Sequence, residues 1–400
     1  MSARTLNSNM RFNVLDAWRG IAAVLVALFH LQAAGHAYDL AFLRNSYLFV
    51  DFFFVLSGFV ISHAYFEKIG NQQAFAEFIV RRFGRVWPLH VTVLGAFVAV
   101  EALKLLLATS GEQAGLAPFD ASGHTAPASL PYHLVLAQAL GVLDKLSWNE
   151  PSWSISAEFW MYVLFGLICV LLTRRTPLAL AALGLAGAAT VAAYSNSGMD
   201  VTFDLGFPRC VFGFTVGALV YRTHTWQAHR SRHRLISGWL SELLAVAMVM
   251  LFVSTAGRTT VSIAAPLVFA IPVFVFGLES GPLSRALVTR PFQALGRWSY
   301  SIYLVHGLIA FVLGLATSWL QRRLGISLWQ EVDTNGVKSR VITGDKFLLD
   351  FLFVMYLVSV VALAALTYRW LEQPGRAYFN RFARRIGNRT PQPESGRVAT

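Results

Sequence analysis

The stretch LDAWRGIAAVLVALFHLQAA, residues 15–34, decides the fold class of this chain. It is apolar and about as long as the roughly 20 residues that a bilayer-spanning helix needs, yet it contains Arg19 and His30. Along a helix, the two residues differ by a rotation of about 20° and a rise of about 16 Å, so they share one face. Ionisable groups inside a span are costly, which favours a functional site. The alternative is an arginine that snorkels to one membrane surface and a hydrogen-bonded histidine near the other.

The composition extends the membrane prediction to the whole chain. Of its 400 residues, 56% are hydrophobic and 14% are charged, and the mean hydropathy is +0.53; soluble proteins are less apolar. Only helices and closed barrels satisfy backbone polar groups in lipid, and these apolar runs are too long for barrel strands. We therefore predict an all-α, polytopic integral membrane protein. It has about ten transmembrane helices, near 15–34, 46–66, 86–108, 154–173, 178–195, 203–221, 238–256, 261–279, 297–319 and 347–371.

The net charge of +12 could suggest a nucleic-acid partner. With the N-terminus inside, however, the inside segments hold 21 of the Lys and Arg residues and the outside segments hold 8. This distribution follows the positive-inside rule and predicts that both termini are cytoplasmic. We expect no nucleic-acid partner.

The chain is predicted to be one membrane-embedded domain, residues 1–386, followed by a disordered polar tail, 387–400. Cys169 and Cys210 both lie in predicted spans, so we expect neither a disulfide framework nor a metal site. The apolar stretch 132–146 is too short to span comfortably, and we predict an interfacial or re-entrant helix on the outer side.

Three arginines precede the third predicted span in FIVRRFGRVWPLH. A helix would group Arg81, Arg82 and Arg85 through their i,i+3 and i,i+4 spacing. Guanidiniums at a cytoplasmic mouth suit phosphate groups. The alternative is anchoring of the topology or contact with lipid headgroups.

Two carboxylates lie near the predicted outer surface. Asp51 in YLFVDFFFVLSGFVIS could approach His30 and orient its imidazole, or it could be an interfacial residue in contact with headgroups. Glu158 in WSISAEFWMY lies about one turn inside a span and needs a partner. It could bind an acceptor hydroxyl, act as an acid or base, or pair structurally with an arginine such as Arg209.

The ninth predicted span begins GRWSYSIYLVHG. Tyr303 and His306 share a helix face at i,i+3 spacing. They are candidate donor-binding residues, and the alternative for His306 is a buried histidine with a purely structural hydrogen bond.

Six motifs in order carry a resemblance to a known family. WRGIAAVLVALFH, FVDFFFVLSGFVIS, RRFGR-x-x-P, WSISAEFWMY, GRWSYSIYLVHG and YRWLEQPGR together resemble the acyltransferase family 3 membrane proteins, across roughly residues 11–380. The resemblance implies a membrane O-acyltransferase that modifies surface polysaccharides or other extracytoplasmic acceptors. It also implies a multi-pass protein of the bacterial cytoplasmic (inner) membrane.

The family's motifs can be carried over residue by residue. Its Arg-x10-His motif corresponds to Arg19 and His30, its Arg-x-x-Arg motif to Arg82 and Arg85, and the glutamate of its Trp-Ser-x-x-x-Glu stretch to Glu158. The C-terminal esterase-like domain that many members carry is expected to be missing. A separate extracytoplasmic partner could therefore complete the transfer.

The expected reaction uses an acyl-CoA, most simply acetyl-CoA, as donor co-substrate at the cytoplasmic face. The acceptor would be a hydroxyl of an extracytoplasmic glycan or glycolipid, and His30 would act as general base or acyl carrier. Alternatives are an acyltransferase for a lipid or small molecule, or a non-catalytic transporter or flippase. A basic outer segment could bind an anionic acceptor or be a solvated loop; its basic residues are Arg322, Arg323, Lys338, Arg340 and Lys346.

Overall fold

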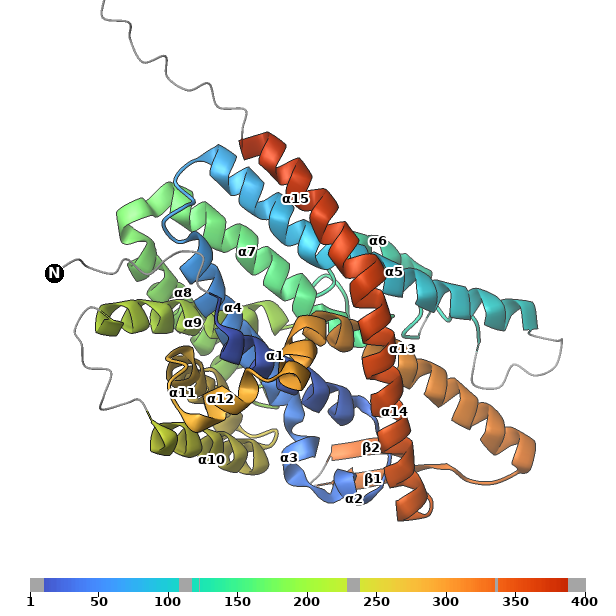
Figure 1. The fold of residues 1–400 in the computed structure, drawn as a ribbon. Helices are drawn as coiled ribbons and strands as arrows, with labels where there is room; N and C mark the ends of the chain where they lie inside the picture. Colours follow the sequence, from blue (N-terminus) through green and yellow to red (C-terminus); the bar gives the residue numbers. More distant parts are fainter. Residues whose placement is uncertain (1–10, 108–116, 122, 229–237, 335–336, 388–400) are drawn as a thin grey trace, which may run out of the picture.

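The computed structural model describes residues 11–107, 117–121, 123–228, 238–334 and 337–387. Within these ranges the chain is mainly helical, and Figure 1 shows long helices packed beside one another. The long helices are α1 (Asn13–His30), α4 (Phe49–Tyr65), α5 (Gln72–Leu107), α7 (Trp153–Leu172), α8 (Thr176–Tyr194), α9 (Gly206–Ala228), α10 (Trp239–Ala256), α11 (Ala265–Gly277), α13 (Arg290–Leu324), α14 (Lys346–Thr367) and α15 (Gln373–Gly387). Shorter elements are α2 (His36–Asp39), α3 (Ala41–Arg44), α6 (Leu130–Leu134) and α12 (Pro282–Leu287).

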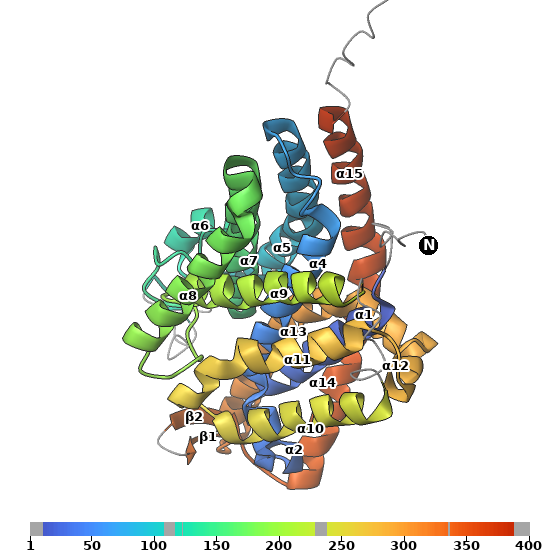
Figure 2. The same cartoon turned by 90° about the vertical axis from the view of Figure 1, so that its left-hand side faces the viewer.

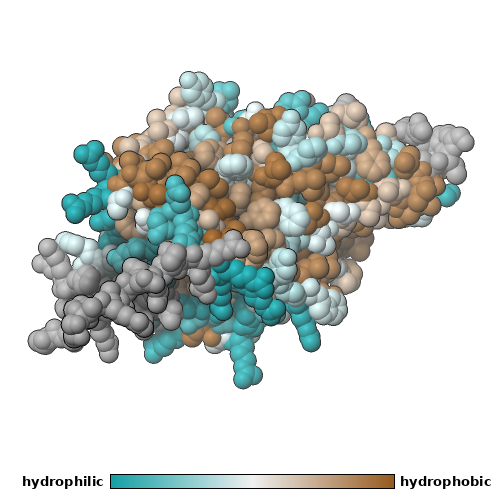
Figure 3. All heavy atoms as spheres, turned by 90° about the horizontal axis from the view of Figure 1, so that it is seen from above, coloured by the Kyte–Doolittle hydropathy of each residue, from teal (hydrophilic) through white to brown (hydrophobic). Residues whose placement is uncertain are grey.

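The helices have the length and composition of a membrane protein. Among the described residues, eight helical segments are long and apolar enough to cross a membrane, and one of them, Glu150–Tyr194, contains both α7 and α8. Each of the ten predicted spans overlaps one long helix. Hydrophobic residues cover much of the face in Figure 3, whereas hydrophilic residues gather toward one edge. The helical membrane class is therefore supported, while the number of crossings and the cytoplasmic termini stay predictions.

Glycines let α1 and α13 approach each other closely. A Cβ on Gly20 would lie 2.5 Å from the backbone carbon of Leu295, and a Cβ on Gly296 would lie 2.4 Å from the carbonyl oxygen of Asp16. Such distances are far inside van der Waals contact, so only glycine fits at this crossing. The close approach brings the polar start of α1 against the polar start of α13.

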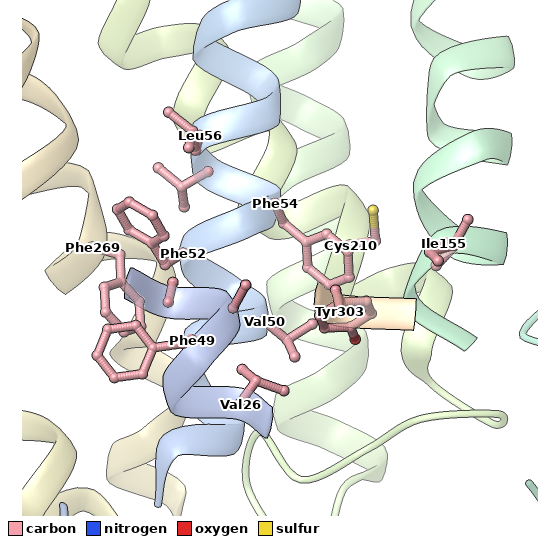
Figure 4. Close-up of a cluster of buried hydrophobic side chains, with 14 of the residues drawn as sticks. Val26, Phe49, Val50, Phe52, Phe54, Leu56, Ile155, Cys210, Phe269 and Tyr303 are labelled. Carbon is pink, nitrogen blue, oxygen red and sulfur yellow. The ribbon is translucent and has the colours of Figure 1, made fainter. Parts of the chain in front are cut away.

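Helices α4 and α9 also pack backbone to backbone. A Cβ on Gly58 would lie 1.9 Å from the carbonyl oxygen of Phe214. Gly58 is thus a helix-packing residue. On its other side α4 contributes to an aromatic core, where the rings of Phe49 and Phe52 meet Phe269 of α11 at centroid distances of 5.3 and 5.8 Å (Figure 4).

The predicted helix over residues 132–146 is wrong. Helix α6 ends at Leu134, and turns and bends follow it. Leu136 and Gly141 have φ angles of 56° and 71°, in the left-handed region that interrupts a helix. The apolar residues of this segment are accommodated individually, since Leu136 is fully buried.

The segment 320–346, which was predicted to lie outside, departs from the all-α expectation. Helix α13 continues to Leu324, and the antiparallel hairpin of β1 (Trp329–Thr334) and β2 (Val337–Ile342) follows. Backbone hydrogen bonds attach this hairpin to the chain just after α1: Ile342 N–H donates to Gln32 at 2.9 Å, and Ala34 N–H donates to Ile342 at 2.8 Å. The predicted tail begins with Gly387, the last residue of α15; positions 388–400 lie outside the described residues.

Candidate active site

Helix α1 carries Arg19 in its first half and His30 at its C-terminal end. The Arg19 guanidinium donates to Ser299 Oγ of α13 at 2.9 Å and pairs with Asp16 at 2.7 Å. His30 is the last residue of the helix. The two side chains therefore contact different parts of the molecule, and each part has its own polar surroundings.

A cavity of about 520 Å³ opens at the Arg19 end. We call it the arginine cavity. Arg82 and Arg85 of α5 and Glu158 of α7 line it together with Arg19. Residues from three separate motifs of the sequence thus meet at one concave site, the kind of place where proteins bind small molecules and cofactors.

The lining of the arginine cavity is strongly basic. Among the described residues, six arginines line it against two carboxylates, Asp16 and Glu158. Sequence reasoning assigned no role to three of these arginines, Arg11, Arg297 and Arg376, although Arg297 lies in GRWSYSIYLVHG and Arg376 ends YRWLEQPGR. Their signal was the dense positive charge of the segments predicted to be cytoplasmic. A cavity with this excess of guanidiniums is suited to a ligand that carries several phosphate charges.

Arg82 is held in place while part of its guanidinium stays available. Its Nη2 donates to the hydroxyl of Tyr65 at 3.0 Å, and its Cζ lies 5.0 Å from the centre of that ring. The buried Nε has no hydrogen-bond partner within the described part of the chain. A buried unpaired donor is unfavourable, so a ligand acceptor in this cavity would be stabilised by it.

Glu158 faces the arginine cavity and not Arg209. The proposed pairing of these two is wrong, because Arg209 gives its hydrogen bonds to other groups. Near Glu158, Ser57 Oγ and the Tyr162 hydroxyl are 2.9 Å apart, and both residues line the same cavity.

Asp51 does not orient His30, as the sequence had suggested. Both of its carboxylate oxygens accept hydrogen bonds from Arg209 of α9, at 2.9 and 2.7 Å, and neither side chain is measurably exposed. The remaining Arg209 donors bond to the carbonyls of Val201 and Tyr47. This pair braces α4 against α9, and it leaves Asp51 no free oxygen for a histidine.

Arg81 does not join Arg82 and Arg85, which corrects the expected grouping of three. Its guanidinium forms an ion pair with Glu77 at 2.5 Å, one turn earlier in α5, and donates to Asn380 of α15 at 3.4 Å. Arg81 does not line the arginine cavity. It therefore helps to hold α15 against α5, which lie side by side in Figure 1.

Tyr303 forms one end of the arginine cavity and leads to the histidines. Its hydroxyl hydrogen-bonds to Ser154 Oγ at 2.7 Å and donates to the Pro151 carbonyl at 3.1 Å. Its ring centre lies 5.6 Å from that of His306, which in turn lies 4.7 Å from that of His30. Of the two predicted donor-binding residues, Tyr303 lines the cavity and His306 lies behind it.

Both histidines are fixed in the same tautomer. His30 Nδ1 lies 2.8 Å from the Val26 carbonyl, and His306 Nδ1 lies 3.3 Å from the Ile302 carbonyl. A carbonyl oxygen only accepts, so each Nδ1 carries the proton and each Nε2 keeps a lone pair. His306 Nε2 is buried without a partner in the described structure. The site thus offers two neighbouring imidazole bases.

The segment that precedes α7 and the middle of α14 support this histidine pair. The Tyr356 hydroxyl of α14 donates to the carbonyl of Ala27 at 3.1 Å and lies 3.3 Å from that of His306, so it joins α1 to α13. Asn149 Nδ2 donates to the Leu304 carbonyl at 3.0 Å. Neither residue carried a recognisable signal in the sequence.

Two further carboxylates were missed. Glu150 interacts electrostatically with His30 and forms an ion pair with His124 at 2.8 Å. Its hydrogen bond and negative charge raise the pKa of His124, which lies in the loop that precedes α6. Glu372 accepts from Ser301 at 2.9 Å, lies 3.7 Å from Arg376, and belongs to the motif YRWLEQPGR.

Comparison with known proteins agrees with this arrangement. Residues 12–369 match the family described as an acyltransferase domain. A protein from Streptomyces mycarofaciens named acyltransferase MdmB is 30% identical over 284 residues, 65% of this chain and 67% of the relative. Protein 2 in the picA locus of Rhizobium radiobacter is 40% identical over 90 residues, 22% of this chain and 45% of the relative's length. No solved structure gives a significant match.

The family match covers nearly the whole membrane domain and includes every residue of the Arg-x10-His, Arg-x-x-Arg and Trp-Ser-x-x-x-Glu motifs. These motifs line the arginine cavity or lie beside the histidine pair. The chain belongs to the family of membrane acyltransferases defined by this acyltransferase domain.

Proposed function

We propose that the protein transfers an acyl group, most simply acetyl, from a cytoplasmic acyl-CoA to a hydroxyl of an extracytoplasmic glycan or glycolipid. The observation that carries this proposal is the continuity from the arginine cavity through Tyr303 and His306 to His30. Basic charge lies at one end of this path and two imidazoles lie at the other.

The donor's phosphates fit the basic lining. Arg82, with its unpaired Nε, and Arg85 would bind them, with Arg297 and Arg376 available for further phosphate oxygens. Charge-assisted bonds from guanidiniums to phosphate are among the stronger hydrogen bonds in proteins. The pantetheine arm would then extend along α1 toward His30, over about 16 Å of helix rise.

His30 supplies the base. Its Nε2 lone pair can remove the proton of the acceptor hydroxyl while the hydroxyl oxygen attacks the thioester carbonyl. The carbon–sulfur bond breaks, an ester bond forms, and the proton ends on the thiol of CoA. Alternatively, Nε2 attacks first and carries the acyl group before the acceptor receives it. His306 Nε2 can share the proton in either sequence.

We also propose that the protein is an enzyme of the bacterial inner membrane. The test uses inside-out membrane vesicles from cells with and without this protein. Acetyl-CoA labelled in its acetyl group is added outside, and label is followed into lumenal glycan, lipid and protein fractions. The proposal expects protein-dependent label in a lumenal glycan or glycolipid. Label that stays in CoA, for acetyl and longer acyl donors alike, would contradict it.

A further inference from the structure

A second cavity, of about 670 Å³, lies at the other end of α1. We call it the His30-end cavity, and it shares no lining residue with the arginine cavity. It is bounded by the end of α1, by α3, by the turn 196–200 and by the end of α10. Both Figure 1 and Figure 2 show α2, α10 and the hairpin at this same end of the molecule.

The His30-end cavity borders the histidine pair. Phe29 and Leu31, the neighbours of His30 in the chain, both line it, and the ring centres of Phe29 and His30 are 4.9 Å apart. Asp200, another lining residue, interacts electrostatically with His30. His30 itself does not line this cavity; its ring packs against Phe29, which does, and against His306.

The lining combines polar groups with aromatic rings. Amides, hydroxyls and charged groups come from Gln32, Asn45, Asn196, Ser197, Asp200, Ser254, Thr255, Arg258 and Thr259, and aromatic faces come from Phe29, Tyr38 and Phe353. Such a mixture of hydrogen-bonding groups and ring faces suits a polyhydroxylated ligand, whose hydroxyls need partners and whose ring carbons need apolar contact.

The charge of the lining is positive. Arg258 is paired with Asp200 at 2.7 Å, but Arg44 and Arg340 add two further guanidiniums. Arg44 is oriented by donating to the Tyr38 carbonyl at 2.6 Å, and Arg340 of the hairpin lies 5.2 Å from the centre of the Trp329 ring. Arginines held in this way match an anionic oxygen group such as a carboxylate.

We propose that the His30-end cavity is the acceptor site and that the acceptor is a carbohydrate bearing a carboxylate. This inference rests on the proposed function and deepens it. Arg44 and Arg340 bind the acidic group, the amide and hydroxyl side chains bind the ring hydroxyls, and one hydroxyl reaches His30. The donor and the acceptor thus enter from opposite ends of α1.

The first test blocks the cavity from the outside. Ser197→Cys is placed in a chain in which the buried Cys169 and Cys210 are replaced by alanine. Intact cells are treated with a bulky, membrane-impermeant maleimide, and inside-out vesicles are then prepared. Transfer of labelled acetyl to the endogenous acceptor should fall at least tenfold, while binding of acetyl-CoA is unchanged. The matched control is Ser327→Cys, at an exposed residue that does not line the cavity.

Each outcome of this test supports or overturns the acceptor site. A cysteine at position 197 that reacts without loss of transfer, or that does not react from outside, overturns the acceptor site. If the untreated protein shows no transfer at all, the proposed function has failed instead, and the two failures are distinguishable. Ser254→Cys repeats the test from α10 in case the first variant is poorly folded.

The second test addresses the class of ligand. Vesicles are formed around digalacturonic acid or around neutral lactose, and competition with labelling of the endogenous acceptor is measured. The acidic disaccharide should compete at a concentration at least tenfold lower than lactose, and Arg44→Gln should remove that difference. Equal competition by the two sugars, or none by either, would show that the acidic-carbohydrate class is wrong.

Discussion

At the scale of single residues, neighbouring arginines of α5 differ in position: Arg82 and Arg85 line the arginine cavity, whereas Arg81 does not. Arg82→Ala combined with Arg85→Ala should weaken acyl-CoA binding by at least about 100-fold, since hydrogen bonds to charged groups contribute about 1.5–3 kcal/mol each and two such groups are lost. The affinity is measured with purified protein in detergent or nanodiscs.

The matched control for that experiment is Arg81→Ala. Arg81 lies in the same helix but pairs with Glu77 outside the cavity, so its loss should leave the affinity for acyl-CoA unchanged. Equal weakening by both sets of substitutions would mean that the arginines act through topology or lipid headgroups and not through the donor.

His124 should show the effect of its carboxylate partner in its titration. Because Glu150 raises its pKa, the ion pair is fully present below the ordinary histidine pKa of about 6.5 and is lost as pH rises through the raised value. Glu150→Gln should lower the pKa of His124. NMR of histidine-labelled protein, assigned with His124→Gln, measures it; an unchanged titration would argue against the pair.

At the scale of the helices, the buried ion pair of Asp51 and Arg209 joins α4 to α9. Asp51→Ala leaves a buried guanidinium without its partner and should reduce the free energy of unfolding by about 3–5 kcal/mol. Thermal unfolding in detergent measures this loss. Replacing both residues by apolar ones of similar size should recover much of it, whereas a single variant as stable as the parent would contradict the assignment.

The crossing of α1 and α13 should tolerate no side chain at Gly296. Gly296→Ala places a Cβ 2.4 Å from a backbone oxygen of α1, and such overpacking typically costs about 1–3 kcal/mol. Gly314→Ala in the same helix meets nothing within 4 Å and should be neutral or stabilising. Thermal unfolding compares the two variants; equal stability would mean that the helices are not in this close contact.

Sequence alone predicted the long helices better than what lies between them. Apolar runs and charge asymmetry carry information about spans, so each predicted span overlaps a helix. Such patterns carry no information about irregular segments, which is why the stretch 132–146 was wrongly predicted to be a helix and the hairpin after α13 was not predicted. Both depend on contacts with distant segments, such as the pairing of Ile342 with the chain after α1.

The sequence predicted the candidate site only in part. The motif residues Arg19, Arg82, Arg85 and Glu158 do meet in one cavity. The partner of Asp51 could not be read from the sequence, because several buried charges compete for each other and only packing decides which pair forms. The arginines contributed by α13 and α15 likewise required the folded arrangement.

At the scale of the whole molecule, α1 connects two chemically different cavities. The arginine cavity lies at its Arg19 end and the His30-end cavity at the other, with the imidazoles between them. In the proposed function, this arrangement separates recognition of a phosphorylated donor from recognition of an acceptor. It gives a membrane acyltransferase a physical reason to retain two ionisable residues in one apolar helix.

The most direct test of this account compares His30→Ala with the parent protein in two measurements. Acetyl-CoA binding should be unchanged, because His30 does not line the arginine cavity. Transfer of labelled acetyl in inside-out vesicles should fall by at least about 100-fold, as expected for loss of a general base. A His30→Ala protein that is folded, inserted and still transfers acetyl at the parental rate would contradict the central claim.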